Sequence, residues 1–195
     1  MDAAALTLRG SAHAEEMVGA SDEWAARLEE VQYTLRDRPG VAAFIDAAPV
    51  LVADLGVDGV RWPGFAAAAA AEGLAAMFAF PLRAGGIRLG RLDLFRRRPG
   101  GLTAAAVADA VVLADLATCA LLEQDDSAGE DEQLRMTLSY QDVNMATGML
   151  AVQLQISLED AFSRLRAHAF SSGCSVLDVA RDLLERRIPL DRLAD

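Results

Sequence analysis

The sequence predicts an α+β protein, in which a mixed N-terminal domain is joined through a long helix to a C-terminal bundle of three short helices. Two observations carry this prediction. The short β-type segments all lie before residue 97, whereas apolar residues in the last third recur at the spacing of amphipathic helices. The 195-residue length allows two small domains, and the 53% hydrophobic content is ample for their cores.

The first two thirds of the chain predict alternating strands and helices. Strands are expected at residues 3–9 and 14–20, joined by a turn at Gly10-Ser11, and Ser21-Asp22 caps a helix that ends at Pro39-Gly40. A buried strand is expected at Val50–Val52, followed by a helix from Gly64 to Glu72, with Pro63 at its start and Gly73 after its end. Strands at 75–82 and 88–95 are expected to form a hairpin, because glycines lie between them. The last element is a helix from Ala104 to Leu122, capped by Thr103.

The last third predicts three amphipathic helices. The second and third begin after Ser157 and Ser175, each followed three residues later by an aspartate, which is the pattern of a capped N-terminus. The first resumes at Gln133 and has two apolar stripes: Met136, Val143, Ala146, Leu150 and Leu154 on one side, and Leu134, Leu138, Met145, Met149 and Val152 on another. One stripe closes the bundle, and the other needs a partner. We therefore expect a homodimer with coiled-coil character, joined through helices near 104–122 and 133–150.

Composition divides the chain at an acidic segment. Residues 1–124 form the expected N-terminal domain with net charge −5, residues 125–133 a linker with five acids and no base, and residues 134–195 the helical domain with net charge −1. Lysine is absent, and the whole chain has net charge −11. Because phosphate binding normally needs a basic balance, any nucleic-acid surface must be local.

Several classes of protein find no support in the sequence. No basic segment and apolar run of a signal peptide opens the chain, and no apolar stretch approaches the ~20 residues of a membrane helix, which predicts a cytoplasmic protein. Cys119 and Cys174 lie far apart, and His13 and His168 are the only histidines, so we expect no disulfide, metal or cofactor. No nucleophile–base or carboxylate pair suggests catalytic residues, and we expect no enzyme.

The three helices carry small and large apolar residues in a defined order: Ala146, Gly148 and Leu150, then Ala161, Phe162, Leu165 and Ala169, and finally Val179 and Ala180. This order resembles the ANTAR domain, an RNA-binding module of bacterial transcription antiterminators. The likeness covers roughly residues 134–188, and Thr147 stands where these domains commonly have a lysine.

The N-terminal part contains a second set of recognisable stretches: 26–35, Pro39-Gly40, Pro49-Val50, Asp54-Leu55, Arg61 to Phe65, Phe80 to Leu82 and Gly90. With these stretches, most of residues 3–123 resemble the GAF domain, a small sensor fold with an antiparallel sheet. GAF domains of this type usually begin with an additional helix, whereas only Met1-Asp2 precedes the first strand here. Either the true start of the chain lies upstream of Met1, or one face of the sheet lacks its usual cover, and the second case would favour a dimer.

These resemblances imply a GAF and ANTAR regulator of the actinobacterial type, which binds stem-loops in nascent transcripts and prevents a terminator hairpin. Sensor domains of the GAF family bind diverse small molecules or none, and an unidentified small-molecule ligand is therefore a possible partner. The expected RNA contacts are Thr147, Gly148, Arg164, Arg166, His168 and Arg181. Trp62, Phe65, Phe78 and Phe80 are candidates for lining a ligand pocket, against the simpler interpretation of core packing.

Two other functions remain open from the residues. A sensor or dimerisation protein that acts through protein contacts fits the acidic balance and the missing lysine. A helix-turn-helix DNA-binding protein is the third hypothesis, since a glycine turn joins the last two helices. Its recognition helix, residues 176–187, would carry Asp178, Asp182 and Glu185 towards phosphates and is disfavoured.

Overall fold

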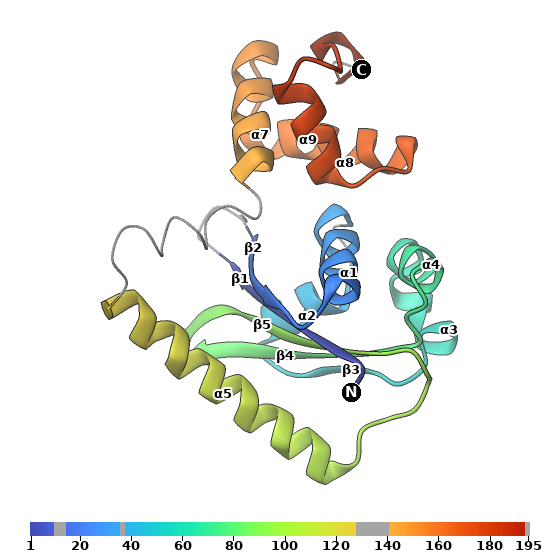
Figure 1. Ribbon diagram of the computed structural model, residues 1–195, viewed down its shortest axis with the longest axis vertical. Coiled ribbons are helices and arrows are strands. Elements are labelled where there is room, and N and C mark those ends of the chain that lie inside the picture. The colour runs from blue at the N-terminus through green and yellow to red at the C-terminus, as the bar shows by residue number, and fades with distance from the viewer. Residues whose placement is uncertain (10–14, 36–37, 128–140, 194–195) are drawn as a thin grey trace. The chain divides into compact units, whose positions relative to one another are not determined.

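The computed structural model describes residues 1–9, 15–35, 38–127 and 141–193 (Figure 1). The chain divides into two compact units, Met1–Met136 and Thr137–Asp195, which are called the N-terminal and C-terminal units below. The expected turn at Gly10-Ser11 and the start of a helix at Gln133 lie outside the described residues.

A five-stranded antiparallel sheet with the strand order β2-β1-β5-β4-β3 forms the centre of the N-terminal unit. The sequence predicted all five strands, and the hairpin turns at Gly85, whose φ of +60° favours glycine. The strands are β1 (Ala3–Arg9), β2 (Glu15–Ala20), β3 (Val50–Val52), β4 (Ala76–Ala84) and β5 (Ile87–Arg96).

Helices cover both faces of this sheet. One face packs against α1 (Glu23–Thr34), α2 (Pro39–Asp46), α3 (Leu55–Asp58) and α4 (Pro63–Ala71), with the short helix η1 (Gly59–Arg61) between the last two. The other face packs against the long helix α5 (Ala104–Ser127), as Figure 1 shows. Because alternate strand residues point to opposite faces, Met77 and Ala79 of β4 face the helix cluster, whereas Phe78 and Phe80 face α5.

Two local predictions were wrong. Pro39-Gly40 begins helix α2, and the preceding helix α1 already ends at Thr34. Proline is well suited to the first turn of a helix, where its missing N–H would have no partner in any case. The strand at Val50–Val52 is an edge strand with Leu51 exposed, because only β4 pairs with it.

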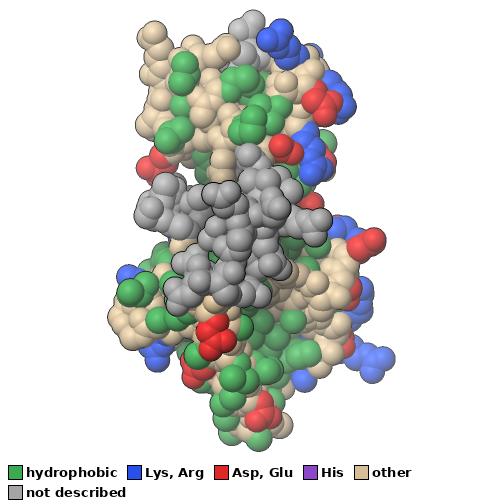
Figure 2. Space-filling view, turned by 60° about the vertical axis from the view of Figure 1, so that its left-hand side comes forward, with side chains coloured by type: hydrophobic (Ala, Val, Ile, Leu, Met, Phe, Trp, Pro, Cys, Tyr) green, Lys and Arg blue, Asp and Glu red, His purple; other side chains and the backbone are tan. Residues whose placement is uncertain are grey.

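The prediction that no apolar segment approaches membrane-spanning length was also wrong. Residues 104–123 of α5 have a mean hydropathy of 2.0 over a window long enough to cross a membrane, and only 17% of that window is buried. One side of α5 packs on the sheet through Ala110, Ala114 and Thr118. The side facing away from the sheet carries exposed Val112 and Leu116, among other apolar residues, and Figure 2 shows apolar side chains gathered there.

The C-terminal unit contains three α-helices and one short helix among its described residues. They are α7 (Gln141–Leu154), α8 (Leu158–Ser172), α9 (Val176–Leu184) and η2 (Leu190–Leu193). Its core is built from residues at helical spacing, namely Val143, Ala146 and Leu150 of α7, Ala161, Leu165 and Ala169 of α8, Val176, Val179, Ala180 and Leu183 of α9, and Leu193. The alanines allow three short helices to pack closely.

Candidate functional site

Capping residues fix the ends of the two helices that carry most of the candidate RNA contacts. Ser157 accepts a hydrogen bond from the N–H of Asp160 at 3.0 Å, and Ser175 accepts one from the N–H of Asp178 at 3.1 Å. Gly173, with a φ of +65°, ends α8 in the left-handed conformation that glycine adopts without strain. These caps hold α8 and α9 in a defined register, as the sequence predicted.

The two candidate residues of α7 lie in different surroundings. Thr147 is buried, and its Oγ1 donates a hydrogen bond to the carbonyl of Val143 at 2.6 Å. Gly148 is half-buried, and a Cβ built on it would meet no described atom within 4 Å. Thr147 therefore satisfies its hydroxyl within the helix, whereas the backbone at Gly148 is open to close approach from outside.

The basic residues of α8 lie on two flanks of the helix. Arg164 donates a hydrogen bond to the carbonyl of Leu193 at 3.0 Å, which ties α8 to η2. Arg166 lies over the ring of Phe162, with its Cζ 5.5 Å from the ring centroid. Residues two apart on a helix are separated by about 200°, so Arg164 and Arg166 stand on opposite sides of the buried stripe. His168 is half-buried and follows Arg164 by one turn.

Arg181 of α9 and Arg187, which follows the helix, are paired with acids. Arg181 Nε lies 3.1 Å from Asp142 Oδ2 of α7. Arg187 contacts Asp182 at 2.7 Å and also Glu185, and both interactions raise its pKa. The expected RNA contacts are thus distributed over three places in the C-terminal unit, and Arg166 has an aromatic neighbour in Phe162.

The four aromatic residues considered for a ligand pocket are all buried, but they do not converge. Trp62 and Phe65 belong to the core between the sheet and the helix cluster, whereas Phe78 and Phe80 belong to the core beneath α5. Core packing accounts for the position of each ring. Within the described part of the chain, no group of three metal-ligating side chains occurs.

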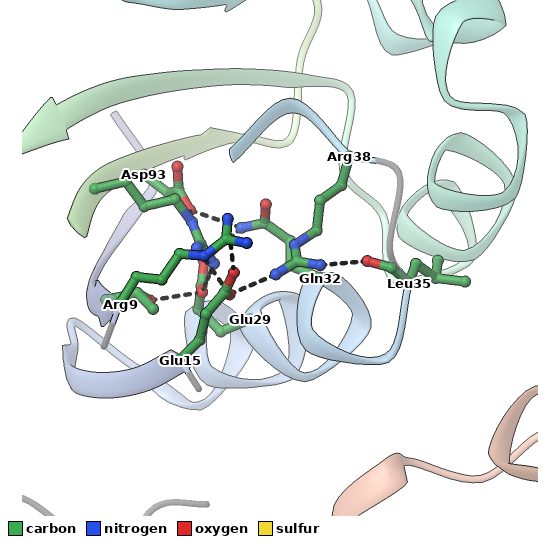
Figure 3. A network of polar contacts seen from close by, with 9 residues as sticks. Arg9, Glu15, Glu29, Gln32, Leu35, Arg38 and Asp93 are labelled. Carbon is green, nitrogen blue, oxygen red and sulfur yellow. Dashed lines mark hydrogen bonds and ion pairs between the residues drawn. The ribbon is translucent and has the colours of Figure 1, made fainter. Parts of the chain in front are cut away.

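A buried network of charges joins the sheet to α1 and α2 in the N-terminal unit (Figure 3). At its centre is Arg91 of β5, which is only 2% exposed and lies 2.9 Å from Glu15, 2.8 Å from Glu29 and 2.7 Å from Asp93. Polar neighbours extend the network: Arg38 contacts Glu15, Gln32 donates to Glu29 and Asp93, and Thr7 donates to Glu29.

The pKa values of the two buried glutamates move in opposite directions. Burial raises the pKa of Glu15, but the charges of Arg91 and Arg38 outweigh this effect and lower it to about 2. For Glu29, burial and the nearby Asp93 outweigh the single ion pair with Arg91 and raise the pKa to about 8. The network therefore holds one strongly acidic carboxyl beside one that retains its proton at neutral pH.

Sequence reasoning missed this network and one exposed aromatic residue. Arg91 and Asp93 are two residues apart in the expected strand 88–95, so their side chains share a face of the sheet. This spacing was the signal in the sequence that could have indicated the ion pair.

Phe170 on α8 is 68% exposed and is the only aromatic residue among the exposed large apolar side chains of the described residues. It follows Arg166 by four residues.

An antiparallel sheet with helices on both faces, followed by a separate three-helix unit, defines a two-domain α+β protein. A scan against family models matches residues 132–184 to the ANTAR domain. A search of curated proteins gave no match.

Solved structures show the fold of the N-terminal unit. A domain of a protein described as a two-component sensor histidine kinase from Sinorhizobium meliloti 1021 has 18% identity and a TM-score of 0.51, with 64% of this chain and 81% of that chain covered. The GAF domain region of a Geobacter sulfurreducens PCA membrane protein has 17% identity and a TM-score of 0.50, covering 62% and 81%. The chain therefore has a GAF plus ANTAR architecture.

Proposed function

We propose that the protein is an RNA-binding transcription antiterminator, in which the GAF-type unit is a sensor and the ANTAR domain binds stem-loops of nascent transcripts. It would work in the cytoplasm as a homodimer, with one ANTAR domain on each of two neighbouring stem-loops. Holding those stems prevents the competing terminator hairpin from forming, and the polymerase continues. This role requires binding alone, without bond-making chemistry.

The match of residues 132–184 to the ANTAR domain is the observation that carries this proposal. The contacts of the basic residues refine it. Arg166 on α8 and the open backbone at Gly148 are the parts best suited to meet RNA. His168 lies on α8 as well, and Arg181 of α9 is joined to α7 through Asp142. Arg164 has a second role, because its bond to Leu193 holds η2 against α8. Thr147 contributes through the structure of α7.

The exposed apolar side of α5 supports the homodimer. Val112, Leu113 and Leu116 are all exposed on this helix, and a second copy of the same helix would remove them from water. Met145 and Val152 of α7 form a second exposed apolar stripe. A dimer would also present twice as many arginine side chains to one RNA molecule. This matters because the chain has a net charge of −11, and few of its cations are available for phosphate.

The test first identifies, by sequencing, the RNA that co-purifies with the protein from cells. A segment of that RNA that contains two adjacent stem-loops is then transcribed in vitro and used for binding. We expect a gel shift with this RNA and none with duplex DNA of the same sequence. Arg166→Ala should weaken binding about tenfold, because a charge-assisted contact contributes ~1.5 kcal/mol. Arg98→Ala, which changes a charge in the N-terminal unit, is the control and should bind as the parent does.

Two results would decide against the proposed function, and a third would change only the assigned interface. Absence of any shift with structured RNA, from a protein that is folded and dimeric, would leave the protein-contact hypothesis. Equal binding to the duplex DNA would favour the helix-turn-helix alternative. Unchanged binding by both Arg166→Ala and Arg164→Ala would retain RNA binding but remove α8 from the interface.

A further inference from the structure

Three residues of α8 form a stripe that alternates aromatic and basic side chains. Phe162, Arg166 and Phe170 are spaced by four residues and therefore lie on one flank of the helix, each about 6 Å beyond the last along its axis. Arg166 is stacked over the ring of Phe162, with 5.5 Å between its Cζ and the ring centroid. Phe170 continues the series at the end of the helix and is 68% exposed.

The packing of the C-terminal unit does not account for the position of Phe170. The buried side of α8 consists of Ala161, Leu165 and Ala169, which together with the other helices complete the core. Phe170 is directed away from that core and leaves most of its ring in water. Covering a large apolar side chain in this position removes its surface from water, which lowers the free energy. An aromatic ring also offers a flat face on which other rings can stack.

The charge around the stripe selects the kind of partner. No acidic residue occurs between Asp160 and Asp178, although the chain has 29 acids in 195 residues. Within this segment Arg166 belongs to the stripe itself, whereas Arg164 and His168 lie on the opposite flank of α8. The stripe therefore presents an arginine to a polyanion without an acid in the same segment, and an arginine plane next to aromatic rings is the arrangement on which unpaired nucleobases stack.

We propose that Phe162, Arg166 and Phe170 form a base-stacking surface, on which unpaired loop nucleotides of the bound RNA rest. This inference depends on the proposed function, since it names how the ANTAR domain holds its RNA. Phe170 stacks one base on its exposed ring, and Arg166 covers a second base while pairing with phosphate. The distance from Phe162 to Phe170 along the helix is about 12 Å, which is between three and four times the ~3.4 Å rise from one stacked base to the next.

The test uses the full-length protein and the dual stem-loop RNA recovered from cells, with 2-aminopurine placed in each loop. Phe170→Leu keeps an apolar side chain but removes the ring, whereas Phe170→Tyr keeps the ring. We expect Phe170→Leu to weaken binding between about fivefold and a hundredfold and to abolish the fluorescence change of the loop base. Phe170→Tyr should retain both within about twofold. Arg166→Lys, which keeps the charge without the plane, should fall between them.

Controls separate this proposal from the proposed function. Val60→Ala removes an apolar side chain of comparable exposure from the N-terminal unit and should change nothing. If the parent binds no RNA, both proposals are wrong. If the parent binds and Phe170→Leu binds equally well with the same fluorescence, the stacking surface is wrong and RNA binding stands. If Phe170→Leu instead changes the sedimentation coefficient and leaves RNA affinity intact, Phe170 is a protein contact and the inference is overturned.

Discussion

At the scale of single residues, the buried charges around Arg91 show how neighbours decide an ionisation state. Glu15 meets Arg91 and Arg38, whereas Glu29 shares Arg91 with Asp93. Their pKa values are accordingly about 2 and about 8. Each carboxyl is isolated from water to a similar degree, so the number of nearby arginines and carboxylates separates them.

Substitution of Glu29 tests this difference through the pH dependence of stability. The folded-state pKa of about 8 lies above the ordinary value of 4.5, so the folded protein binds this proton more tightly than the unfolded chain. The stability that Glu29 contributes is therefore complete below pH 4.5 and is lost as the pH rises to 8. Glu29→Gln should flatten the fall in the free energy of unfolding between pH 5 and 8, by a few kcal/mol in order of magnitude.

The free energy of unfolding is measured at each pH by tryptophan fluorescence in urea, because Trp24 and Trp62 both lie in the N-terminal unit. Glu15 provides a contrast: its lowered pKa contributes stability above pH 4.5 that is lost as the pH falls towards 2. Parallel pH profiles for the parent and Glu29→Gln would show that Glu29 is ionised in the folded protein at neutral pH.

At the scale of elements, glycines in two helices have opposite surroundings. Gly40 is in the first turn of α2, where a Cβ would lie 2.5 Å from Arg91 Nε and 2.6 Å from Gln32 Oε1. The backbone of α2 thus approaches the charge network directly, and any side chain would push it away. Gly148 of α7 has no described atom within 4 Å of a Cβ. Packing explains the first glycine but not the second.

Alanine substitutions at these positions should change stability in opposite directions. Gly40→Ala should destabilise the N-terminal unit by about 1–3 kcal/mol, as overpacking of a core does. Gly148→Ala should stabilise the C-terminal unit by up to ~1 kcal/mol, because alanine favours a helix interior. Urea unfolding separates the two, since tryptophan fluorescence follows the N-terminal unit and far-UV circular dichroism follows both.

The Gly148→Ala variant also tests the proposed contact between RNA and the backbone of α7. If RNA approaches the backbone at Gly148, the more stable Gly148→Ala protein should bind RNA more weakly. A loss of stability in Gly148→Ala would instead reveal a contact made by that face, and the glycine would then have a packing role.

At the scale of the whole molecule, an acidic protein must gather its cations to bind RNA. The chain has net charge −11, and several arginines of the C-terminal unit are engaged by acids or by backbone carbonyls. Affinity should therefore depend on duplication of the binding surface in a dimer, since two linked sites bind far more tightly than either alone.

Leu116→Glu tests this dependence, because Leu116 is 60% exposed on the apolar side of α5. We expect the parent to sediment as a dimer at tens of micromolar and the variant as a monomer. The variant should lose affinity for two adjacent stem-loops but retain the weak affinity for one. Val60→Glu, a charge at another exposed apolar position, is the matched control. A parent protein that sediments as a monomer, or floats with lipid vesicles through α5, would contradict the dimer.

Local patterns were sufficient for the strands, most of the helices and the family likenesses. The two short segments on either side of Gly10-Ser11 predicted β1 and β2, the two glycines predicted the β4–β5 hairpin, and Ser157 and Ser175 predicted where α8 and α9 begin. These features depend on neighbours within a few residues, which the sequence contains directly. The start of α2 at Pro39 was missed because proline both ends and begins helices.

The candidate site was only partly predictable from the sequence. Arg164, Arg166, His168 and Arg181 could be named from residue type and position, but their partners could not. Leu193 lies 29 residues from Arg164 and Asp142 lies 39 residues from Arg181, so folding alone brings each pair together. Phe170 was overlooked because exposure is a property of the packed bundle.

The sequence by itself determined the two-part architecture, the helix periodicities and the acidic balance, because these depend on composition and short-range spacing. Only the tertiary structure decided that Arg91 is enclosed by three carboxyls, that Phe78 and Trp62 serve opposite faces of the sheet, and that Phe170 remains in water. The physical reason is that ionisation and burial depend on atoms brought close by packing, at separations along the chain that no local pattern specifies.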